Sequence, residues 1–213
     1  MNVRLETIIS LLSTTDTFAD VGCDHGYVSK EVLSRGLAKK VYVTDISKPS
    51  LQKAIDLLTD SGFDSFEAFL TDGLESVPQA DQVLIAGMGG QEIVKILKKS
   101  AYKPLIVVLQ PMKNADLVRK ELHSLGYGII RDFMFYADDK YYEIIKAQLG
   151  VSDGYTQLEE EFGRENLCGN KDFKRYLDNM MKMIESARSS SNISEDSSQK
   201  LTKKLQVLRG LIK

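Results

Sequence analysis

The sequence predicts an α/β fold in which parallel strands form a sheet between two layers of helices. Short apolar runs rich in β-branched residues alternate with segments of helical periodicity, and this alternation is typical of a parallel sheet. The resulting architecture is a three-layer sandwich. The expected strands are 18–22, 40–45, 66–71, 82–87 and 105–110, and the helices between them are 27–36, 48–60, 90–100 and 114–125.

A second pattern begins after Gly126. The stretches 128–137 and 141–149 have the composition of long strands, and Asp138-Asp139-Lys140 separates them. An acidic turn between two strands predicts an antiparallel hairpin at the end of the sheet.

Beyond Gly150 the strand patterns stop, and 155–188 and 195–213 are helical in composition on either side of the polar break 189–192. Apolar residues recur there every three or four positions. Two narrow seams of matching length predict an antiparallel coiled-coil hairpin, whereas the alternative packs both helices on the sheet. We expect two domains, 1–150 and 151–213. The seams are Phe173, Leu177, Met180, Ile184 and Ala187, and then Leu201, Leu205, Leu208 and Ile212.

Composition excludes several classes of protein. Of the 213 residues, 43% are hydrophobic and 27% charged, as in ordinary folded proteins. No apolar run approaches the roughly 18 residues of a membrane helix, and Arg4 and Glu6 interrupt any signal core, so we expect no membrane contact and a cytoplasmic location. Cys23 and Cys168 lie far apart, which indicates neither a disulfide framework nor a Cys-x-x-Cys site.

Charge is distributed unevenly along the chain. The formal net charge is -2, but residues 1–150 hold 17 basic and 20 acidic residues, whereas residues 171–213 hold 10 basic and 5 acidic ones. A tail with a net charge of +5 favours a partner with phosphates, although a solvated helix face also collects lysines.

The segment from Asp20 to Tyr27, Asp-Val-Gly-Cys-Asp-His-Gly-Tyr, lies where the first strand passes into the first helix. Parallel sheets bind ligands beyond the carboxyl ends of their strands, and glycine there allows a close backbone approach. Asp24 stands where the dinucleotide fingerprint has its middle glycine, and a carboxylate would repel a pyrophosphate. The motif therefore favours a cationic partner, such as an amino group or a sulfonium.

Two further acids end successive strands. Asp45 lies 19 residues after Gly26, where nucleoside-binding α/β folds place an acid for the ribose hydroxyls. The alternative is a cap for the next helix, but Ser47 is better placed for that role. Asp72 follows the third strand in Thr71-Asp72-Gly73. Three acids at three strand ends predict one nucleoside-binding site.

Metal and thiol chemistry are weaker interpretations of the same residues. Cys23, Asp24 and His25 are consecutive and diverge in direction, and His123 has no cysteine nearby in the sequence, so a zinc site is disfavoured. Cys23 could be a nucleophile at a helix N-terminus, but packing is the simpler role. His123 is expected at the surface.

The order of these motifs resembles a family of class I methyltransferases that use S-adenosylmethionine, namely the bacterial family that methylates N1 of adenine 22 in tRNA. The resemblance runs from Arg4-Leu5 to about Ala147 and includes Glu161-Phe162-Gly163. It rests on Asp-x-Gly-x-Asp-His from Asp20, Thr-Asp-Ile-Ser from Thr44, Thr-Asp-Gly-Leu from Thr71, Ala86-Gly87-Met88-Gly89-Gly90, Leu109-Gln110-Pro111 and Lys140-Tyr-Tyr-Glu-Ile-Ile145.

The resemblance implies a Rossmann-like catalytic domain, S-adenosylmethionine as cofactor, tRNA as partner, and no metal. By its motifs the methionine end of the cofactor would lie at Gly22, Asp24, His25 and Gly26. Asp45 and Ile46 would hold the ribose, Asp72 and Gly73 would meet the adenine, and Gly87, Met88 and Gly89 would line the floor where donor and acceptor meet.

The segment Gly87-Met88-Gly89-Gly90 also bears on the acceptor. Enzymes that methylate exocyclic amino groups commonly carry Asn/Asp-Pro-Pro-aromatic there, so a ring nitrogen is favoured. N1 of adenine has a lone pair and needs no strong base. Asp24 and Tyr27 are the expected catalytic residues, the first offsetting positive charge and the second stacking on the base.

Two other functions fit parts of the sequence. A small-molecule methyltransferase would have the same cofactor motifs, and only the basic tail distinguishes it. A non-catalytic RNA-binding protein with a degenerate methyltransferase fold would keep the tail, but the intact acids at three strand ends argue against it.

Overall fold

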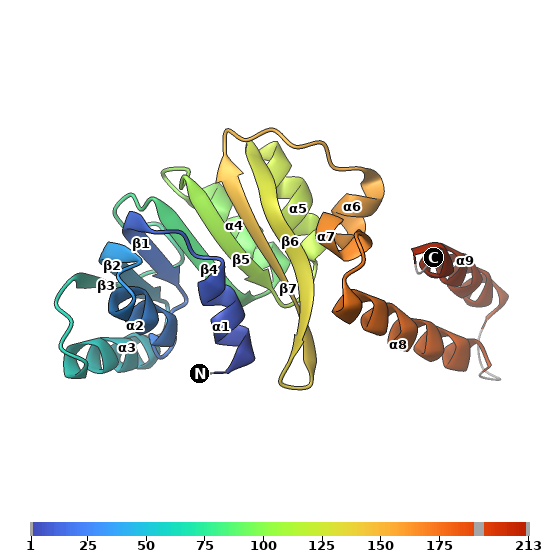
Figure 1. The fold of residues 1–213 in the computed structure, drawn as a ribbon, viewed down its shortest axis with the longest axis horizontal. Coiled ribbons are helices and arrows are strands. Elements are labelled where there is room, and N and C mark those ends of the chain that lie inside the picture. Colours follow the sequence, from blue (N-terminus) through green and yellow to red (C-terminus); the bar gives the residue numbers. More distant parts are fainter. Residues whose placement is uncertain (1, 190–193, 212–213) are drawn as a thin grey trace.

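The computed structural model describes residues 2–189 and 194–211, and its centre is a seven-stranded sheet in the order β3-β2-β1-β4-β5-β7-β6 (Figure 1). The first five strands are parallel, and β7 joins β5 in antiparallel pairing. This confirms the predicted α/β fold with a hairpin at the end of the sheet. The strands are β1 (Thr15–Val21), β2 (Ala38–Asp45), β3 (Phe66–Leu70), β4 (Gln82–Met88), β5 (Ile106–Pro111), β6 (Tyr127–Ala137) and β7 (Lys140–Leu149).

Helices cover both faces of the sheet. Figure 1 shows α1 (Val3–Ser10), α2 (Tyr27–Ser34) and α3 (Lys48–Asp60) on one face and α4 (Gly90–Lys99) and α5 (Ala115–Ser124) on the other. Central strands alternate between the two resulting cores: Val83 and Ile85 pack with α4 and α5, whereas Leu84 packs with α1 and α2. Both faces are therefore buried, as the continuous apolar runs predict.

Helix α1 is an element that the sequence analysis does not anticipate. Asn2 caps it by accepting a hydrogen bond from the backbone N–H of Leu5, and Ile8 and Ile9 are buried against the sheet. The helix therefore belongs to the core, and its first turn lies near the carboxyl ends of the strands.

The β6–β7 hairpin closes through a two-residue turn. Asp138 and Asp139 both have positive φ angles, 47° and 59°, and Lys140 pairs with Ala137 as the first residue of β7. Two left-handed residues in succession define the tight turn that fits twisted antiparallel strands. The predicted turn is therefore confirmed, except that Lys140 belongs to the strand.

The segment 155–188, predicted as one helix, forms three: α6 (Gln157–Phe162), α7 (Arg164–Leu167) and α8 (Lys171–Arg188). The prediction of one helix was wrong because Gly163 takes a φ of +86° and ends α6. A Cβ at this position would lie 2.9 Å from Arg119 Nη2, so glycine allows the chain to pass over a buried arginine.

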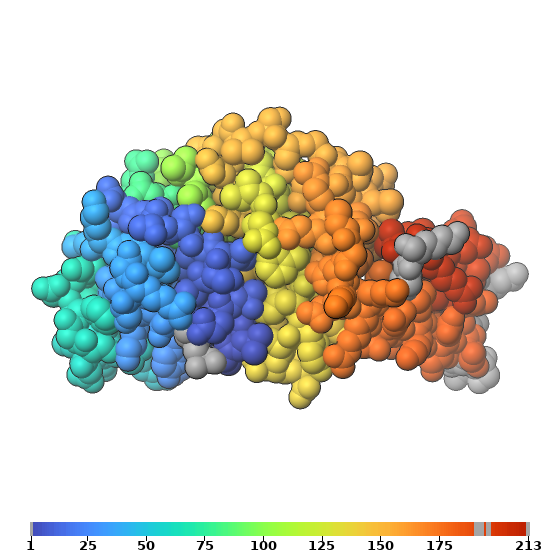
Figure 2. Space-filling view, viewed as in Figure 1, coloured from blue at the N-terminus to red at the C-terminus, as the bar shows by residue number. Residues whose placement is uncertain are grey.

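Helices α8 and α9 (Glu195–Leu211) pack against each other along the predicted seams. Phe173, Leu177, Ile184, Leu205 and Leu208 are buried there together with Met134 of β6, whereas Ala187 is exposed and Ile212 lies outside the described residues, as do residues 190–193 of the predicted break. Figure 2 shows this hairpin in orange and red at one end of the molecule. The first half of α8 contacts the sheet, as far as Asn179, which donates to the Tyr141 hydroxyl at 3.3 Å, and the rest of the hairpin projects from it.

The edge strand β6 is covered by polar side chains from the C-terminal segment. Four of its backbone N–H groups donate to side-chain oxygens that lie between residues 153 and 172, at distances of 2.6–3.0 Å. An open edge strand would present these groups to other chains, so the segment protects the sheet. The pairs are Ile129 with Asp153, Asp132 with Glu165, Met134 with Asn166, and Tyr136 with Asp172.

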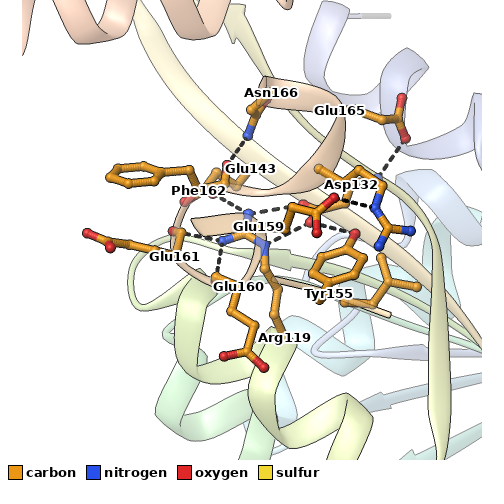
Figure 3. Close-up of polar contacts among 12 residues, drawn as sticks. Arg119, Asp132, Glu143, Tyr155, Glu159, Glu160, Glu161, Phe162, Glu165 and Asn166 are labelled. Atoms are coloured by element: carbon orange, nitrogen blue, oxygen red, sulfur yellow. Dashed lines mark hydrogen bonds and ion pairs between the residues drawn. The ribbon is translucent and has the colours of Figure 1, made fainter. Parts of the chain in front are cut away.

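A buried arginine joins the same segment to the sheet (Figure 3). The Nε and Nη2 atoms of Arg119 donate to the two carboxylate oxygens of Asp132 at 2.8 and 3.0 Å, and Nη2 also donates to Glu143 at 2.6 Å. Nη1 lies 3.3 Å from the carbonyl oxygen of Glu161 in α6, and Tyr155 donates to Asp132. Because Arg119 and Asp132 are fully buried, the contact between the sheet and residues 155–161 is part of the core.

None of the described helices is both long enough and apolar enough to cross a membrane.

Candidate active site

A cavity of about 730 Å³ opens at the carboxyl ends of β1, β2, β3 and β4. The sheet order places the change of winding direction between β1 and β4, which is where open α/β sheets bind ligands. The volume lies within the range of about 300–1,000 Å³ that ligand pockets occupy. Ten of the predicted site residues line the cavity: Gly22, Asp24, His25, Tyr27, Asp45, Ile46, Asp72, Gly73, Gly87 and Met88.

The remaining two predicted residues, Gly26 and Gly89, stand behind the lining as N-caps of α2 and α4. Gly26 has a φ of +73°, and a Cβ there would lie 2.9 Å from the Cβ of Ala54 on α3. Glycine at 26 therefore allows α2 and α3 to pack closely and positions the loop, without facing the cavity itself.

The loop after β1 is held by backbone contacts to β2. The N–H groups of Gly22 and Cys23 both donate to the carbonyl oxygen of Thr44, at 2.8 and 3.0 Å. Gly22 has a φ of +71°, and a Cβ on it would collide with the methyl group of Met88. The close approach of the first and fourth strand ends therefore requires glycine at this position.

Asp24, His25 and Tyr27 form a polar and aromatic group on one side of the opening. A carboxylate oxygen of Asp24 lies 2.7 Å from His25 Nδ1, and the His25 and Tyr27 rings are parallel within 6° at a centroid separation of 5.7 Å. Tyr27 keeps 53% of its surface exposed. The group offers an acceptor and a flat ring to a ligand that enters from solvent.

Asp45 is fixed by its own neighbours before any ligand binds. Its two carboxylate oxygens accept from the backbone N–H groups of Ser47, at 2.8 Å, and Asp24, at 3.1 Å. Each oxygen can accept a second hydrogen bond, so the carboxylate remains available to two vicinal hydroxyls. Ser47 caps α3, which confirms the expected cap and leaves Asp45 for another role.

Asp72 and Gly73 close the far side of the cavity. Lys95 Nζ lies 3.4 Å from the Asp72 carboxylate, and the carbonyl oxygen of Gly73 accepts from the Thr44 hydroxyl at 3.2 Å. Gly73 has a φ of +70°, and a Cβ built on it would lie 2.9 Å from side-chain atoms of Ile96, so no side chain fits at this position. A flat ring at this end would meet backbone and the edge of α4.

Asp20 and Arg4 also line the cavity, although neither is among the site residues predicted from the sequence. Asp20 is buried beneath the loop, accepts from the Ser29 hydroxyl at 2.7 Å, and has its pKa raised to about 6, chiefly by desolvation. Arg4 reaches the cavity from α1. Asp20 opens the Asp-x-Gly-x-Asp-His motif, and Arg4 lies at the start of the family resemblance, but neither residue type at these positions indicated a place in the site.

The other interpretations of this region find less support. Burial raises the pKa of the Cys23 thiol, and Asp20 raises it further, so the thiol stays protonated and is a poor nucleophile. Among the residues that the structure describes, no group of three or more His, Cys, Asp or Glu side chains could hold a metal ion. His123 is half-buried against Tyr155, with ring centroids 5.0 Å apart, so its expected surface position was wrong.

The fold and the site define a methyltransferase. The methyltransferase-domain family model matches residues 1–145, and the chain belongs to that family. This confirms the predicted Rossmann-like methyltransferase class. The curated relatives include the tRNA (adenine(22)-N(1))-methyltransferase of Bacillus subtilis, 29% identical over 159 residues that cover 72% of this chain and 67% of the relative. A putative tRNA methyltransferase of Mycoplasma pneumoniae is 31% identical over 61% of this chain and 62% of its own length.

Solved structures share the whole architecture. Streptococcus pneumoniae Sp1610, described as a putative tRNA (m1A22) methyltransferase, superposes with a TM-score of 0.92 at 24% identity over 100% of both chains. The TrmK protein of M. capricolum, in complex with S-adenosyl-homocysteine, has a TM-score of 0.90 at 24% identity and covers 100% of this chain and 97% of its own. The fold therefore extends to the C-terminal helices.

The cavity fits a nucleoside that carries a positively charged arm. Asp45 presents acceptors for vicinal hydroxyls, the backbone at Gly73 leaves a flat space, and the carboxylates of Asp20 and Asp24 lie on the side of the first loop. These are the groups that a ribose, a purine and a sulfonium with its amino group would each require.

Proposed function

We propose that the chain transfers a methyl group from S-adenosylmethionine to N1 of adenine 22 in the D arm of tRNA. The observation that carries the proposal is the convergence of Asp24, Asp45 and Asp72 on one cavity beside the Gly87-Met88 strand end. The relationship to a tRNA (adenine(22)-N(1))-methyltransferase supports the choice of substrate. A tRNA substrate also favours a cytoplasmic location.

The cofactor supplies an electrophilic methyl group on a positively charged sulfur. The predicted residues would hold it with its ribose on Asp45 and Ile46, its adenine by Asp72 and Gly73, and its methionine end at Gly22, Asp24, His25 and Gly26. Asp45 would keep both existing backbone hydrogen bonds while it accepts the hydroxyls, because each oxygen has a second lone pair. The ribose site is therefore organised in advance.

The chemical step would need little from the protein besides position and charge. The N1 lone pair forms the new N–C bond as the C–S bond breaks, and the sulfur keeps that electron pair. The methylated adenine becomes a cation without losing a proton in the step. Asp24, two-thirds exposed at the opening, would offset this charge, and Tyr27 would stack on the extruded base.

Gly87, Met88 and Gly89 would form the floor on which donor and acceptor meet. Met88 touches the position of a Cβ on Gly22, so the floor also separates the two strand ends. The segment Gly87-Met88-Gly89-Gly90 itself contains neither the Asn/Asp nor the prolines that amino-directed enzymes commonly carry there, which favours a ring nitrogen as acceptor.

The projecting α8–α9 hairpin would supply RNA affinity, in keeping with the proposed division at residue 150. Lys182, Lys203 and Lys204 are exposed on it, and the segment from 171 onward has a net charge of +5. The hairpin is attached at β6, at the other edge of the sheet from the β1–β3 side of the cavity, so it would suit a folded RNA whose backbone extends well past the reacting base.

The test of the proposal is mass spectrometry of nuclease digests. A tRNA with adenine at position 22 is incubated with enzyme and S-adenosylmethionine beside the same tRNA with guanine 22. We expect 1-methyladenosine in the first and no methylation of the second. Asp24→Ala and Tyr27→Ala should lower turnover by more than they weaken tRNA binding. Equal methylation of both tRNAs, another product, or reaction only with small molecules would refute the proposal.

A further inference from the structure

Arg4 is the one arginine side chain, among the described residues that line the cavity, that reaches the end of β4. Its Nη2 atom lies 3.1 Å from the position of a Cβ on Gly87, and Gly87 itself has a φ of +81°. The guanidinium therefore stands beside the Gly87-Met88 floor and lines the same cavity.

Neutral groups hold this guanidinium in place. Its Nε and Nη2 atoms donate to the same side-chain oxygen of Gln110, at 2.9 and 2.7 Å, and it lies 5.4 Å from the centre of the Tyr142 ring. Gln110 is fully buried, and its amide nitrogen donates to the carbonyl oxygen of Pro111 at 3.3 Å. Arg4 is thus oriented by an amide whose own orientation is fixed.

The charge of Arg4 is not compensated within the described part of the chain, where no acidic side chain forms an ion pair with it. Arg35 and Arg119, in contrast, each contact two carboxylates, Glu6 and Glu31 in the first case and Asp132 and Glu143 in the second. Two of the five N–H groups of Arg4 are directed at Gln110, so three remain for a ligand.

A phosphate fits these donors better than a base does. The planar guanidinium matches two oxygens of a phosphodiester, and the pair strengthens where water is partly excluded. The proposed reaction also creates a positive charge on the base. A free guanidinium beside that base would oppose the reaction, whereas one neutralised by the phosphate of the same nucleotide would not.

We infer that Arg4 binds a phosphodiester that flanks the target nucleotide and so holds the extruded base against the floor of the cavity. This inference rests on the proposed function, because it takes an RNA as the acceptor. Gln110 is the positioning residue, since it fixes the guanidinium without neutralising it.

The experiment combines enzyme variants with a modified substrate. Wild type, Arg4→Gln and a control, Arg35→Gln, are compared on the tRNA and on two versions that carry an uncharged methylphosphonate on the 5′ or the 3′ side of adenosine 22. We expect Arg4→Gln to weaken tRNA binding about tenfold or more and to leave S-adenosylmethionine binding unchanged. One of the two methylphosphonate tRNAs should bind wild type and Arg35→Gln more weakly than the native tRNA does, again by about tenfold. For Arg4→Gln the same modification should weaken tRNA binding by less than about twofold.

Gln110→Glu tests the same idea without removing the arginine. It places a carboxylate at the guanidinium, so it should reproduce the loss of tRNA binding even if Arg4→Gln folds poorly. The inference is overturned if wild type binds both methylphosphonate tRNAs with the same affinity as the native tRNA. It is also overturned if the modification lowers the affinity of Arg4→Gln as much as it lowers that of wild type. A wild-type enzyme that forms no 1-methyladenosine on unmodified tRNA would instead refute the proposed function.

Discussion

At the scale of single residues, we expect Asp45 to contribute more to cofactor affinity than any other single side chain. Replacing it with alanine removes an ionised acceptor for ribose hydroxyls, which should cost about 1.5–3 kcal/mol, or roughly tenfold to more than hundredfold in affinity. Calorimetry with S-adenosylmethionine measures this loss. Unchanged binding by a folded Asp45→Ala protein would show that the ribose lies elsewhere.

Asp20 makes stability depend on pH. Burial raises its pKa from 3.8 to about 6, so the folded protein binds this proton more tightly than the unfolded chain does. Stability from this group therefore increases as the pH falls from 7 toward 4, by up to about 3 kcal/mol. Asp20→Asn cannot ionise and can still accept from Ser29, so it should be more stable than wild type at pH 8.

Thermal unfolding of the ligand-free proteins at pH 8 and pH 5 tests this. The advantage of Asp20→Asn should shrink at the lower pH, while Asp16→Asn, at an exposed position, should stay within about 0.5 kcal/mol of wild type at both. A constant difference between Asp20→Asn and wild type would contradict a titrating Asp20.

The site residues that could be predicted from the sequence are those that lie at the carboxyl ends of predicted strands. Asp24, Asp45 and Asp72 each follow an apolar run, and parallel pairing brings all three to one edge of the sheet. Arg4 lies outside that rule, because it reaches the cavity from a helix that crosses a face of the sheet. No local pattern fixes such a crossing, which depends on packing between distant segments.

At the scale of elements, the same limit explains the broken helix at residues 155–188. Its composition is helical throughout, and only the contact of Gly163 with Arg119 shows why the chain must turn there. The helix boundaries therefore depend on a buried charge 44 positions earlier in the sequence. The α8–α9 seam was predictable in advance, because its packing is local and periodic.

Among the contacts that join separate elements, those of Arg119 should be the ones whose loss lowers stability most. Removing one partner of a buried ion pair leaves the other uncompensated, which typically costs about 3–5 kcal/mol. We expect Arg119→Ala to lower the free energy of unfolding by about this amount. Arg131→Gln is the matched control: its contact with Glu165 is half-exposed, so its loss should cost no more than about 1 kcal/mol. Denaturant unfolding compares the two, and equal effects would argue against a structural role for the buried pair.

At the scale of the whole molecule, the basic hairpin is attached to the sheet along the edge strand β6. Residues 153–172 cap the N–H groups of β6 and cover Arg119 before α8 begins to project. Cutting the chain near Gly150 would expose that edge as well as remove the hairpin. A test of RNA binding is therefore clearer with point variants that keep the junction intact.

Lys203 and Lys204 are adjacent, exposed and on α9, so neutralising them changes charge without disturbing the buried Leu205 beside them. If the hairpin contacts RNA phosphates, Lys203→Gln with Lys204→Gln should weaken tRNA binding and lower the slope of log affinity against log salt by up to about 2, roughly one for each phosphate contact. The matched control is Lys39→Gln with Lys40→Gln, an adjacent pair on β2 already bound to Asp16 and Glu67. Filter binding over a range of salt concentrations measures both slopes. A hairpin variant with the wild-type slope, or a control that loses as much, would assign RNA affinity to the catalytic domain and leave α8 and α9 a structural role.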